Sequence, residues 1–402
     1  MNIGIVTTWF DRGAAFVSKQ FADVLSNDNK VYIFARGGES YDQSSSYWKQ
    51  YPVTWSKRYA GGSTRINWPQ FKDWVEDNNI DVVLFNEQQD WEIVADAKNL
   101  NIKTVAYIDY YTQETIPFFQ LYDAVICNTK RHLEALNGHP NAYYIPWGTD
   151  TDVFKPKKEN TTSLNAPIFF HSAGMGGINL RKGTDILVES FSHVKSDNAQ
   201  LIIHSQSPIK SYPSIRKIIE SDSRIKFIEK TVSPPGLYHL GNVYVYPSKL
   251  EGIGLTICEA LACGLPTITT NTQPMNEFVE DGKTGVLVDI ERHIARADGY
   301  YWPESICSKS SLTKAMQFFV DNPGEIQEYS SNAVETSLNQ FNWKKNASCL
   351  NPIFLEISKN EPVSIDKSLR PRALGYSFEK REKHWSIWGK IQRKIGRLYN
   401  QL

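Results

Sequence analysis

Short apolar runs rich in β-branched residues alternate with helical stretches along most of this chain. Continuous apolar strands separated by helices are typical of parallel sheets that helices cover on both faces. The pattern predicts strands at Ile3–Val6, Lys30–Phe34, Val53–Trp55, Val82–Phe85, Thr104–Ile108, Ala124–Cys127, Tyr143–Ile145, Ile168–His171, Leu201–His204, Ile225–Ile228, Val243–Tyr246, Thr267–Thr270 and Gly285–Val288. The predicted fold class is therefore α/β, with doubly wound parallel sheets.

The strand and helix rhythm breaks at a polar stretch, Lys155–Asn165, and then restarts. The 402 residues also exceed the roughly 250–300 residues at which single cores stop growing. We therefore predict two Rossmann-like domains that face a cleft, an N-terminal one over residues 1–155 and a C-terminal one over residues 165–340. A ligand is expected at the carboxyl ends of the strands, where sheets of this kind bind their substrates.

Composition and charge exclude several classes of protein. The 44 basic side chains balance the 44 acidic ones, whereas a general nucleic-acid binder has a basic excess. No stretch approaches the ~20 apolar residues of a membrane span, and the amino terminus is interpreted as a first strand rather than a signal peptide. Five scattered cysteines without a CxxC spacing favour reduced thiols in a cytoplasmic protein and argue against a zinc site.

The carboxyl-terminal residues differ in character from the two domains. Residues 359–402 are interpreted as a linker followed by a basic amphipathic helix, Phe378–Leu402. The apolar side chains that share one face of this helix are Trp385, Trp388, Ile391, Ile395, Leu398, Tyr399 and Leu402. Such a helix suits an anionic membrane surface, and equally the protein's own body or a second subunit. Both interpretations stay open, because amphipathicity alone does not name the apolar partner.

One segment, Tyr246–Pro266, concentrates the chemistry. It begins where a buried strand ends, turns through Gly252 and Gly254, and becomes helical from about Leu255. Glycines allow a ligand to approach the backbone closely, and the free N–H groups at a helix start attract anions. A diphosphate is the ligand that this arrangement favours.

Two glutamates flank the glycine turn. Glu259 lies about one turn into the helix, where its carboxylate can accept hydrogen bonds from vicinal hydroxyls such as those of a ribose. Glu251 lies just before the turn, where a second polyol could be held. Taken singly, Glu251 is more simply interpreted as a solvated acid of a loop, and Glu259 as an exposed residue of a helix. Taken together, the two acids and the glycines indicate a binding site.

The pattern P-S-x-x-E-G-x-G-L-x-x-x-E-A-x-A-x-G-x-P over residues 247–266 resembles the E-x7-E signature of the family 4 retaining glycosyltransferases. The resemblance continues in Arg181–Leu187 and Pro146–Phe154, and it covers roughly residues 1–358. It implies the GT-B fold of two Rossmann-like domains, with a helix over residues 341–358 that crosses back to the N-terminal domain. It also implies transfer of a hexose from a nucleotide-sugar, UDP-sugar first and GDP-mannose second, to a saccharide or lipid-linked saccharide.

The resemblance implies a role for each matching position. Glu251 would contact hydroxyls of the donor sugar, Glu259 the ribose, and Lys182 would place a positive charge against the diphosphate. The diphosphate would also be cradled by the backbone amides of Gly252, Ile253, Gly254 and Leu255. Gly13, after the first strand, would bring amides toward the phosphates or the acceptor, and a simple tight turn is the alternative.

The sequence departs from the family at two places. Many relatives carry a Gly-Arg pair after the first strand of the second domain, but here no arginine stands between Gly174 and Arg181. Amides of that loop, or Arg181 itself, are expected to grip the phosphates instead. Relatives often place a histidine after the fifth strand of the first domain. Asp109 is the nearest polar candidate for a catalytic group there, with helix capping as the alternative.

No cofactor and no metal are expected. Asp150-Thr151-Asp152 spells the DxD that holds a metal in a different glycosyltransferase fold, but here it falls in the linker block, where an aspartate commonly caps a turn. The expected partners are the donor, the acceptor and, as one option, an anionic membrane surface contacted by residues 378–402, which would place the protein at the cytoplasmic face of a membrane. An oligomer is left open and nucleic acid is not expected.

Two other classes of protein stay as alternatives. An inactive relative could act as a scaffold of a glycan-assembly complex, although the intact Glu251 and Glu259 argue against it. A dinucleotide-dependent oxidoreductase could share these layers, but no GxGxxG follows the first strand, so this alternative is weak.

Overall fold

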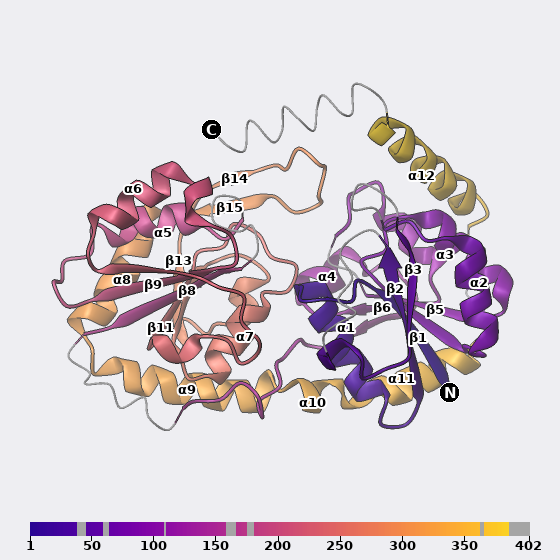
Figure 1. Ribbon diagram of the computed structural model, residues 1–402, viewed down its shortest axis with the longest axis horizontal. Helices are drawn as coiled ribbons and strands as arrows, with labels where there is room; N and C mark the ends of the chain where they lie inside the picture. Colours follow the sequence, from indigo (N-terminus) through magenta and orange to yellow (C-terminus); the bar gives the residue numbers. More distant parts are fainter. Residues whose placement is uncertain are drawn as a thin grey trace. The chain divides into compact units, whose positions relative to one another are not determined.

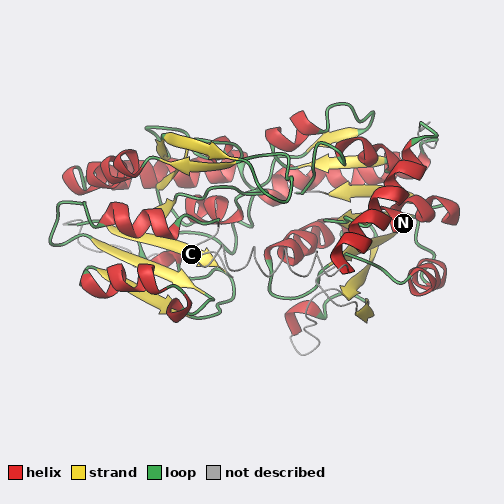
Figure 2. Ribbon diagram, turned by 90° about the horizontal axis from the view of Figure 1, so that it is seen from above, coloured by secondary structure: helices red, strands yellow, loops and turns green. Residues whose placement is uncertain are grey.

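The computed structural model describes residues 1–37, 46–58, 64–107, 110–157, 166–174, 181–361 and 366–385, with side chains up to Ser377. The chain divides into two compact units (Figure 1). Unit 1 comprises Met1–Ile145 and the segment that starts at Lys344, and unit 2 comprises Pro146–Trp343. Each unit is built on its own parallel sheet with helices packed against it (Figure 2).

Unit 1 contains a seven-stranded sheet in the order β3-β2-β1-β4-β5-β6-β7, and all of its neighbouring strands are parallel. The strands are β1 (Asn2–Thr7), β2 (Lys30–Gly37), β3 (Val53–Arg58), β4 (Val82–Asn86), β5 (Lys103–Tyr107), β6 (Ala124–Cys127) and β7 (Ala142–Tyr144). Every residue of β4 and β6 is buried, which explains why these strands read as continuous apolar runs.

Three of the helices of unit 1 begin at a capping side chain. The helices of this unit are α1 (Gly13–Leu25), η1 (Ser46–Trp48), α2 (Trp68–Asp77), α3 (Trp91–Ala97), η2 (Lys98–Leu100), η3 (Ile116–Leu121), α4 (Lys130–Ala135), α10 (Trp343–Asn346), which starts at the junction, η7 (Ala347–Cys349), α11 (Leu350–Lys359) and α12 (Leu369–Trp385). The side chains of Asn67, Asp90 and Thr129 cap α2, α3 and α4, and each satisfies a backbone N–H that lacks a helical partner. After the junction the chain packs against α1 and the turn that follows it. Asn351 Nδ2 donates to the Val24 carbonyl of α1 (3.3 Å), and Asn29 Nδ2, in the turn, donates to Asn351 Oδ1 (2.8 Å).

Helix α12 differs from the predicted linker, because it begins at Leu369 and not near residue 378. Pro371 lies in the first turn of α12, where a proline costs no helical hydrogen bond. Ala373 is fully buried, the Tyr376 ring lies 5.8 Å from that of Phe118, and Trp91 N donates to Ser377 Oγ (3.0 Å). The start of α12 therefore docks on α3 and η3. The side chains from residue 378 onward lie outside the described residues, so the membrane role stays a prediction.

Unit 2 contains a six-stranded parallel sheet in the order β10-β9-β8-β11-β12-β13. Its strands are β8 (Ile168–Gly174), β9 (Gln200–Ser205), β10 (Ile225–Glu229), β11 (Val243–Tyr246), β12 (Thr267–Thr270) and β13 (Gly285–Val288). A separate antiparallel hairpin follows, formed by β14 (Ile290–Ile294) and β15 (Glu304–Cys307). The sequence pattern missed this hairpin. The residues of β14 are mostly exposed, so they lack the alternation of apolar and polar residues that indicates a strand.

Helices cover both faces of the sheet of unit 2. They are α5 (Thr184–Phe191), η4 (Ile209–Ser211), α6 (Pro213–Ser221), η5 (Tyr238–Leu240), α7 (Leu255–Ala262), η6 (Met275–Glu277), α8 (Lys309–Asp321) and α9 (Glu325–Gln340). Figure 1 shows α5 and α6 on one face and α7 and α9 on the other. On the first face, α5, α6 and α8 bury apolar side chains such as Leu187, Ile215 and Met316 against the strands.

The predicted fold class is confirmed. Every strand that the sequence pattern predicted is present, with ends that differ by a few residues, and both sheets are parallel with the strand order of doubly wound folds. No helix among the described residues is long and apolar enough to cross a membrane.

Candidate active site

Several of the residues that the sequence singled out in unit 2 gather where its strand order reverses. We call this place the switch point of the sheet. The strands β8 and β11 are neighbours in the sheet, and the chain runs outward from them in opposite directions. Lys182 lies between β8 and α5, and Glu251 lies between β11 and α7. Both loops leave the carboxyl edge of the sheet, which is the usual ligand site of such folds.

The Glu251 carboxylate is the centre of the site. Its Oε1 atom accepts hydrogen bonds from Lys182 Nζ (2.8 Å), the Tyr246 hydroxyl (2.8 Å) and the Ser248 hydroxyl (2.5 Å). Its Oε2 atom lies 3.3 Å from Arg181 NH1. Lys182 Nζ also donates to the Tyr246 hydroxyl. Three donors thus hold one oxygen, while the other faces a half-exposed guanidinium.

The charges of this cluster are set by burial and by the neighbouring groups. Burial alone would raise the pKa of Glu251, but Arg181 and Lys182 lower it to about 2. Burial lowers the pKa of Lys182 to about 8, although Glu251 acts in the opposite direction. At neutral pH the carboxylate is therefore ionised and the lysine mostly protonated. Two cations face one anion, which favours an anionic ligand.

The turn before α7 leaves the start of the helix open. Gly254 precedes Leu255, the first residue of the eight-residue α7, with φ +94°, a conformation that favours glycine. No side chain in the described part of the chain caps this helix. Gly252 and Ile253 complete the turn directly after Glu251. The first amides of α7 are thus available for an anion.

Glu259 lies further along α7 and has a different partner. The Tyr238 hydroxyl donates to Glu259 Oε2 (2.5 Å). Burial raises the pKa of Glu259, and the Tyr238 hydrogen bond and the Lys182 charge partly oppose this effect. The two glutamates of the signature are therefore held in separate hydrogen-bond groups, one by Lys182 and one by Tyr238.

Close packing of the two loops fixes the site. Gly183, which precedes α5, has φ +69°, and a Cβ atom there would lie 2.1 Å from the Pro247 carbonyl oxygen. Lys249 N donates to the Arg181 carbonyl (2.7 Å), and Lys249 Nζ to Asp185 Oδ2 (2.9 Å). The backbone that carries Lys182 is therefore tied to the backbone that carries Glu251.

Other predicted residues belong to other elements of the chain or lie outside the described residues. Gly174 ends β8 with φ +62°, and its carbonyl accepts from Gln206 N (3.1 Å). Gly13 is the exposed first residue of α1 in unit 1. Asp109 lies outside the described residues. Asp150 Oδ1 accepts from Asp152 N (3.0 Å), so the DxD sequence forms a turn in which the aspartate contacts the backbone.

Sequence reasoning missed three residues of the site: Tyr238, Tyr246 and Ser248. A signal for Tyr246 was present, because Tyr244 and Tyr246 share one face of β11 and a buried tyrosine hydroxyl usually has a hydrogen-bond partner. Tyr238 lies 21 positions before Glu259, and no short spacing links the two.

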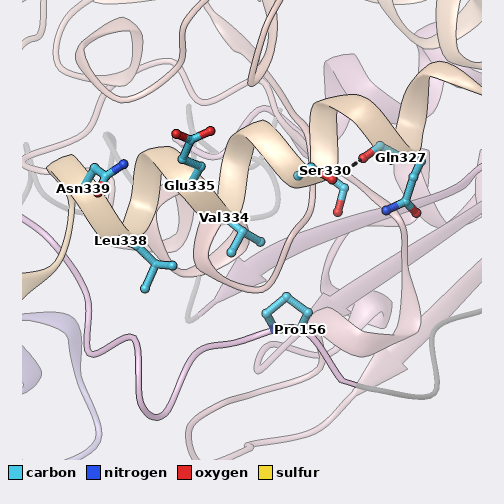
Figure 3. Close-up of a pocket in the computed structure, with 8 residues that line it drawn as sticks. Pro156, Gln327, Ser330, Val334, Glu335, Leu338 and Asn339 are labelled. Atoms are coloured by element: carbon cyan, nitrogen blue, oxygen red, sulfur yellow. Dashed lines mark hydrogen bonds between the residues drawn. The ribbon is translucent and has the colours of Figure 1, made fainter.

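A groove of about 550 Å³ lies elsewhere in unit 2, along α9 (Figure 3). Pro156 lies opposite Ser330, Val334 and Leu338, which are side chains of α9. It is open and holds one carboxylate, Glu335, among small polar and apolar side chains. It lacks the paired charges of the Glu251 cluster, and we do not assign the active site to it.

Residues 170–299, which include this cluster, match the family model described as "Glycosyl transferases group 1". D-inositol 3-phosphate glycosyltransferase from Arthrobacter sp. (strain FB24) is 29% identical over 185 residues, 41% of this chain and 43% of the relative. The lipopolysaccharide core biosynthesis mannosyltransferase LpsB of Rhizobium meliloti (strain 1021) is 28% identical over 181 residues, 41% of this chain and 51% of the relative. These matches span about half the length of the curated relatives.

The similarity to solved structures extends over both units. Sucrose-phosphate synthase from Thermosynechococcus elongatus has a TM-score of 0.69 at 17% identity, over 89% of this chain and 99% of that one. HepE of Anabaena, solved in complex with UDP-glucose, has a TM-score of 0.68 at 16% identity, over 89% and 99% of the two chains. At this identity the likeness shows the fold.

The two parallel-sheet units and the solved structures that match both of them show the GT-B glycosyltransferase fold. Within that fold, the match over residues 170–299 and the relatives support a family 4 type for this part of the chain. The resemblance drawn from the E-x7-E segment is therefore confirmed, and the expectation of a glycosyltransferase enzyme agrees with the relatives.

Proposed function

We propose that this chain is a retaining glycosyltransferase that moves a hexose from a nucleotide-sugar to a hydroxyl of a saccharide or lipid-linked saccharide. The observation that carries the proposal is the Lys182–Glu251 pair (2.8 Å) in the loops that lead to α5 and α7, together with a start of α7 that no described side chain caps. A nucleotide-sugar has an anionic diphosphate next to a polyol. A site with two cations, one ionised carboxylate and open helix amides complements both parts.

A UDP-sugar is the first candidate for the donor and GDP-mannose the second. The first is supported by HepE of Anabaena, which has the same fold and was solved with UDP-glucose. The second is supported by LpsB of Rhizobium meliloti, which is named as a mannosyltransferase.

Each end of the donor has its own set of contacts in this proposal. The amides at Gly254 and Leu255 and the Lys182 ammonium receive the diphosphate. The side chain of Arg181 is 41% exposed, and in this proposal it turns from Glu251 Oε2 to the phosphates. This movement would supply the cation that the family's Gly-Arg pair provides. Glu251 then accepts from hydroxyls of the sugar, and Glu259 from hydroxyls of the ribose.

The transfer breaks the bond between the sugar C1 and the diphosphate oxygen, and the diphosphate leaves with the electron pair. The acceptor oxygen bonds to C1 on the same face, and its proton passes to the departing phosphate oxygen. Lys182 and the start of α7 stabilise the charge that develops on the leaving group. We propose that this positive charge makes a divalent ion unnecessary. Asp109 stays the candidate for a group near the acceptor.

The test is the release of nucleotide by the purified full chain from UDP-glucose, UDP-N-acetylglucosamine and GDP-mannose. Glu251→Gln keeps the volume of the side chain and removes its charge, and we expect turnover to fall about 10²–10³-fold. Glu220→Ala, which removes an exposed carboxylate of α6, is the control and should leave turnover unchanged. Chelation with EDTA should also leave turnover unchanged, and loss of turnover would contradict the metal-independent step.

The inactive scaffold is the alternative that this experiment separates. It predicts that UDP or GDP binds, that Glu251→Gln weakens binding, and that no donor is turned over. The anomeric configuration of the product, read by NMR, tests retention independently.

A further inference from the structure

Tyr246 touches both groups that are proposed to hold the two ends of the donor. Its hydroxyl accepts a hydrogen bond from Lys182 Nζ and donates one to Glu251 Oε1 (2.8 Å). Lys182 Nζ also lies 4.9 Å from the centre of the Tyr246 ring. The tyrosine side chain is fully buried. It is thus a direct link between the ammonium and the carboxylate.

The sheet holds this phenol in place. Tyr246 is the last residue of β11, and its ring stacks on that of Tyr244, with centroids 5.5 Å apart and planes 19° apart. The strand pairs with β12, and Thr269 Oγ1 donates to the Tyr246 carbonyl (2.8 Å). Lys182 and Glu251 lie on loops, whereas Tyr246 lies on a buried strand. The strand residue is therefore the rigid reference for the two loop residues.

We propose that Tyr246 is a positioning residue whose hydroxyl sets the separation of Lys182 and Glu251, so that the ammonium meets the diphosphate while the carboxylate meets the sugar. This inference rests on the proposed function, since it requires a donor at this site. Ser248 provides a contrast, because its hydroxyl reaches Glu251 Oε1 and the Arg181 carbonyl (3.0 Å). Ser248 supports the carboxylate, whereas Tyr246 supports both charges.

The charged neighbours of Lys182 determine what loss of the phenol would do. Burial lowers the pKa of Lys182 to about 8; Arg181 acts in the same direction, and Glu251 and Glu259 in the opposite one. His171, buried nearby, has a pKa lowered to about 4 by burial and is neutral in this range. A phenol oxygen that accepts from the ammonium favours its charged form. Removing that oxygen should lower the pKa of Lys182 further, and the ammonium would then be lost at a lower pH.

The experiment measures the affinity of the full chain for UDP and for GDP between pH 6.5 and pH 10, by intrinsic fluorescence. In the wild type, affinity should fall as pH rises through about 8, where Lys182 loses its proton. In Tyr246→Phe the midpoint should move at least about 0.5 pH unit lower, with affinity at pH 6.5 changed less than about threefold. Turnover of the donor at pH 7 should fall about tenfold, because the ammonium is no longer held against the leaving group.

Two matched variants give the test its specificity. Tyr244→Phe removes a buried hydroxyl from the same strand and the same stack, and Ser248→Ala removes a donor of Glu251 that does not contact Lys182. Both should keep the wild-type midpoint. Thermal unfolding of each variant reports folding, and Tyr246→Met is a second variant without the phenol.

The outcomes separate this inference from the function on which it rests. If the wild type binds neither UDP nor GDP, the proposed function fails. If the wild type binds with a midpoint near pH 8 and Tyr246→Phe keeps that midpoint, the positioning role is overturned while the function stands. The role is also overturned if Tyr244→Phe moves the midpoint as far as Tyr246→Phe does.

Discussion

The two sheets reverse their strand order at equivalent places, yet the hydrogen-bonded clusters found there differ, one being charged and the other neutral. In unit 2 the reversal between β8 and β11 carries Arg181, Lys182 and Glu251, which are all charged. In unit 1 a buried neutral network lies at the reversal between β1 and β4, while the loops beyond these strands carry Asp11, Arg12 and Glu87. Asn86 Nδ2 donates to the Ala14 carbonyl (2.8 Å) and to Ser18 Oγ (2.6 Å).

The neutral network of unit 1 is directed inward. Ser18 Oγ donates to Thr7 Oγ1 (2.7 Å), so that β1, β4 and α1 are joined by one buried set of hydrogen bonds. In unit 2 the charged groups lie beside open helix amides instead. We infer from the comparison that the doubly wound fold supplies a place for a ligand, and that the side chains determine whether this place binds one or stabilises the unit.

The largest expected effect is on Lys182, the buried cation of the charged switch point. Lys182→Met removes the charge against the leaving diphosphate, and we expect donor turnover to fall about 10³-fold. The control is Lys226→Met, a surface lysine of β10 that bonds Gln200 (3.0 Å), which should keep turnover within about twofold. Equal losses in the two variants would show that the buried charge has no special role.

A second prediction tests how much the contact between the Gly183 loop and the Pro247 loop contributes to the stability of the protein. Gly183→Ala places a Cβ atom against the Pro247 carbonyl and forces an alanine to a positive φ. We expect the free energy of unfolding to fall by about 2–5 kcal/mol, measured by urea denaturation. Gly324→Ala is the matched control, because its φ is −63° and no atom lies within 4 Å of the added Cβ. A similar small change in both variants would contradict the proposed loop contact.

Much of this architecture could be predicted from the sequence, because local patterns determine it. Buried parallel strands require continuous apolar runs, and these runs located the strands of both sheets. The spacing of Glu251, Gly254 and Glu259 in one segment, and the block around Lys182, located the residues of the candidate site. The same short segment also predicted the turn through Gly252 and Gly254 and the start of α7 at Leu255.

The parts that could not be predicted depend on contacts between distant residues. Lys182 and Tyr246 are 64 positions apart, and only the pairing of β8 with β11 brings the loop that carries Lys182 to the end of the strand that carries Tyr246. The docking of α12 depends on where its buried face meets α3 and η3, which no periodicity specifies. The β14–β15 hairpin lacks the apolar alternation by which strands are recognised.

The smallest expected effect concerns Asn86, the centre of the neutral network. Asn86→Ala removes the amide that holds α1 to β4, and we expect the free energy of unfolding to fall by about 1–2 kcal/mol. All of its described partners are neutral. The loss of stability should therefore be the same in 0.1 M and in 1 M NaCl, where the electrostatic screening length is about 10 Å and about 3 Å. The exposed Asn27→Ala, in the same unit, should change stability by less than about 0.5 kcal/mol.

The same variant also tests the comparison between the two switch points. If the neutral network only holds unit 1 together, Asn86→Ala should leave the affinity for UDP unchanged at temperatures where the protein is folded. A tenfold loss of affinity would mean that the start of α1, where Gly13 was predicted to approach the phosphates, takes part in donor binding. The distinction between a charged switch point that binds and a neutral one that supports the fold would then be wrong, since both would serve the same ligand.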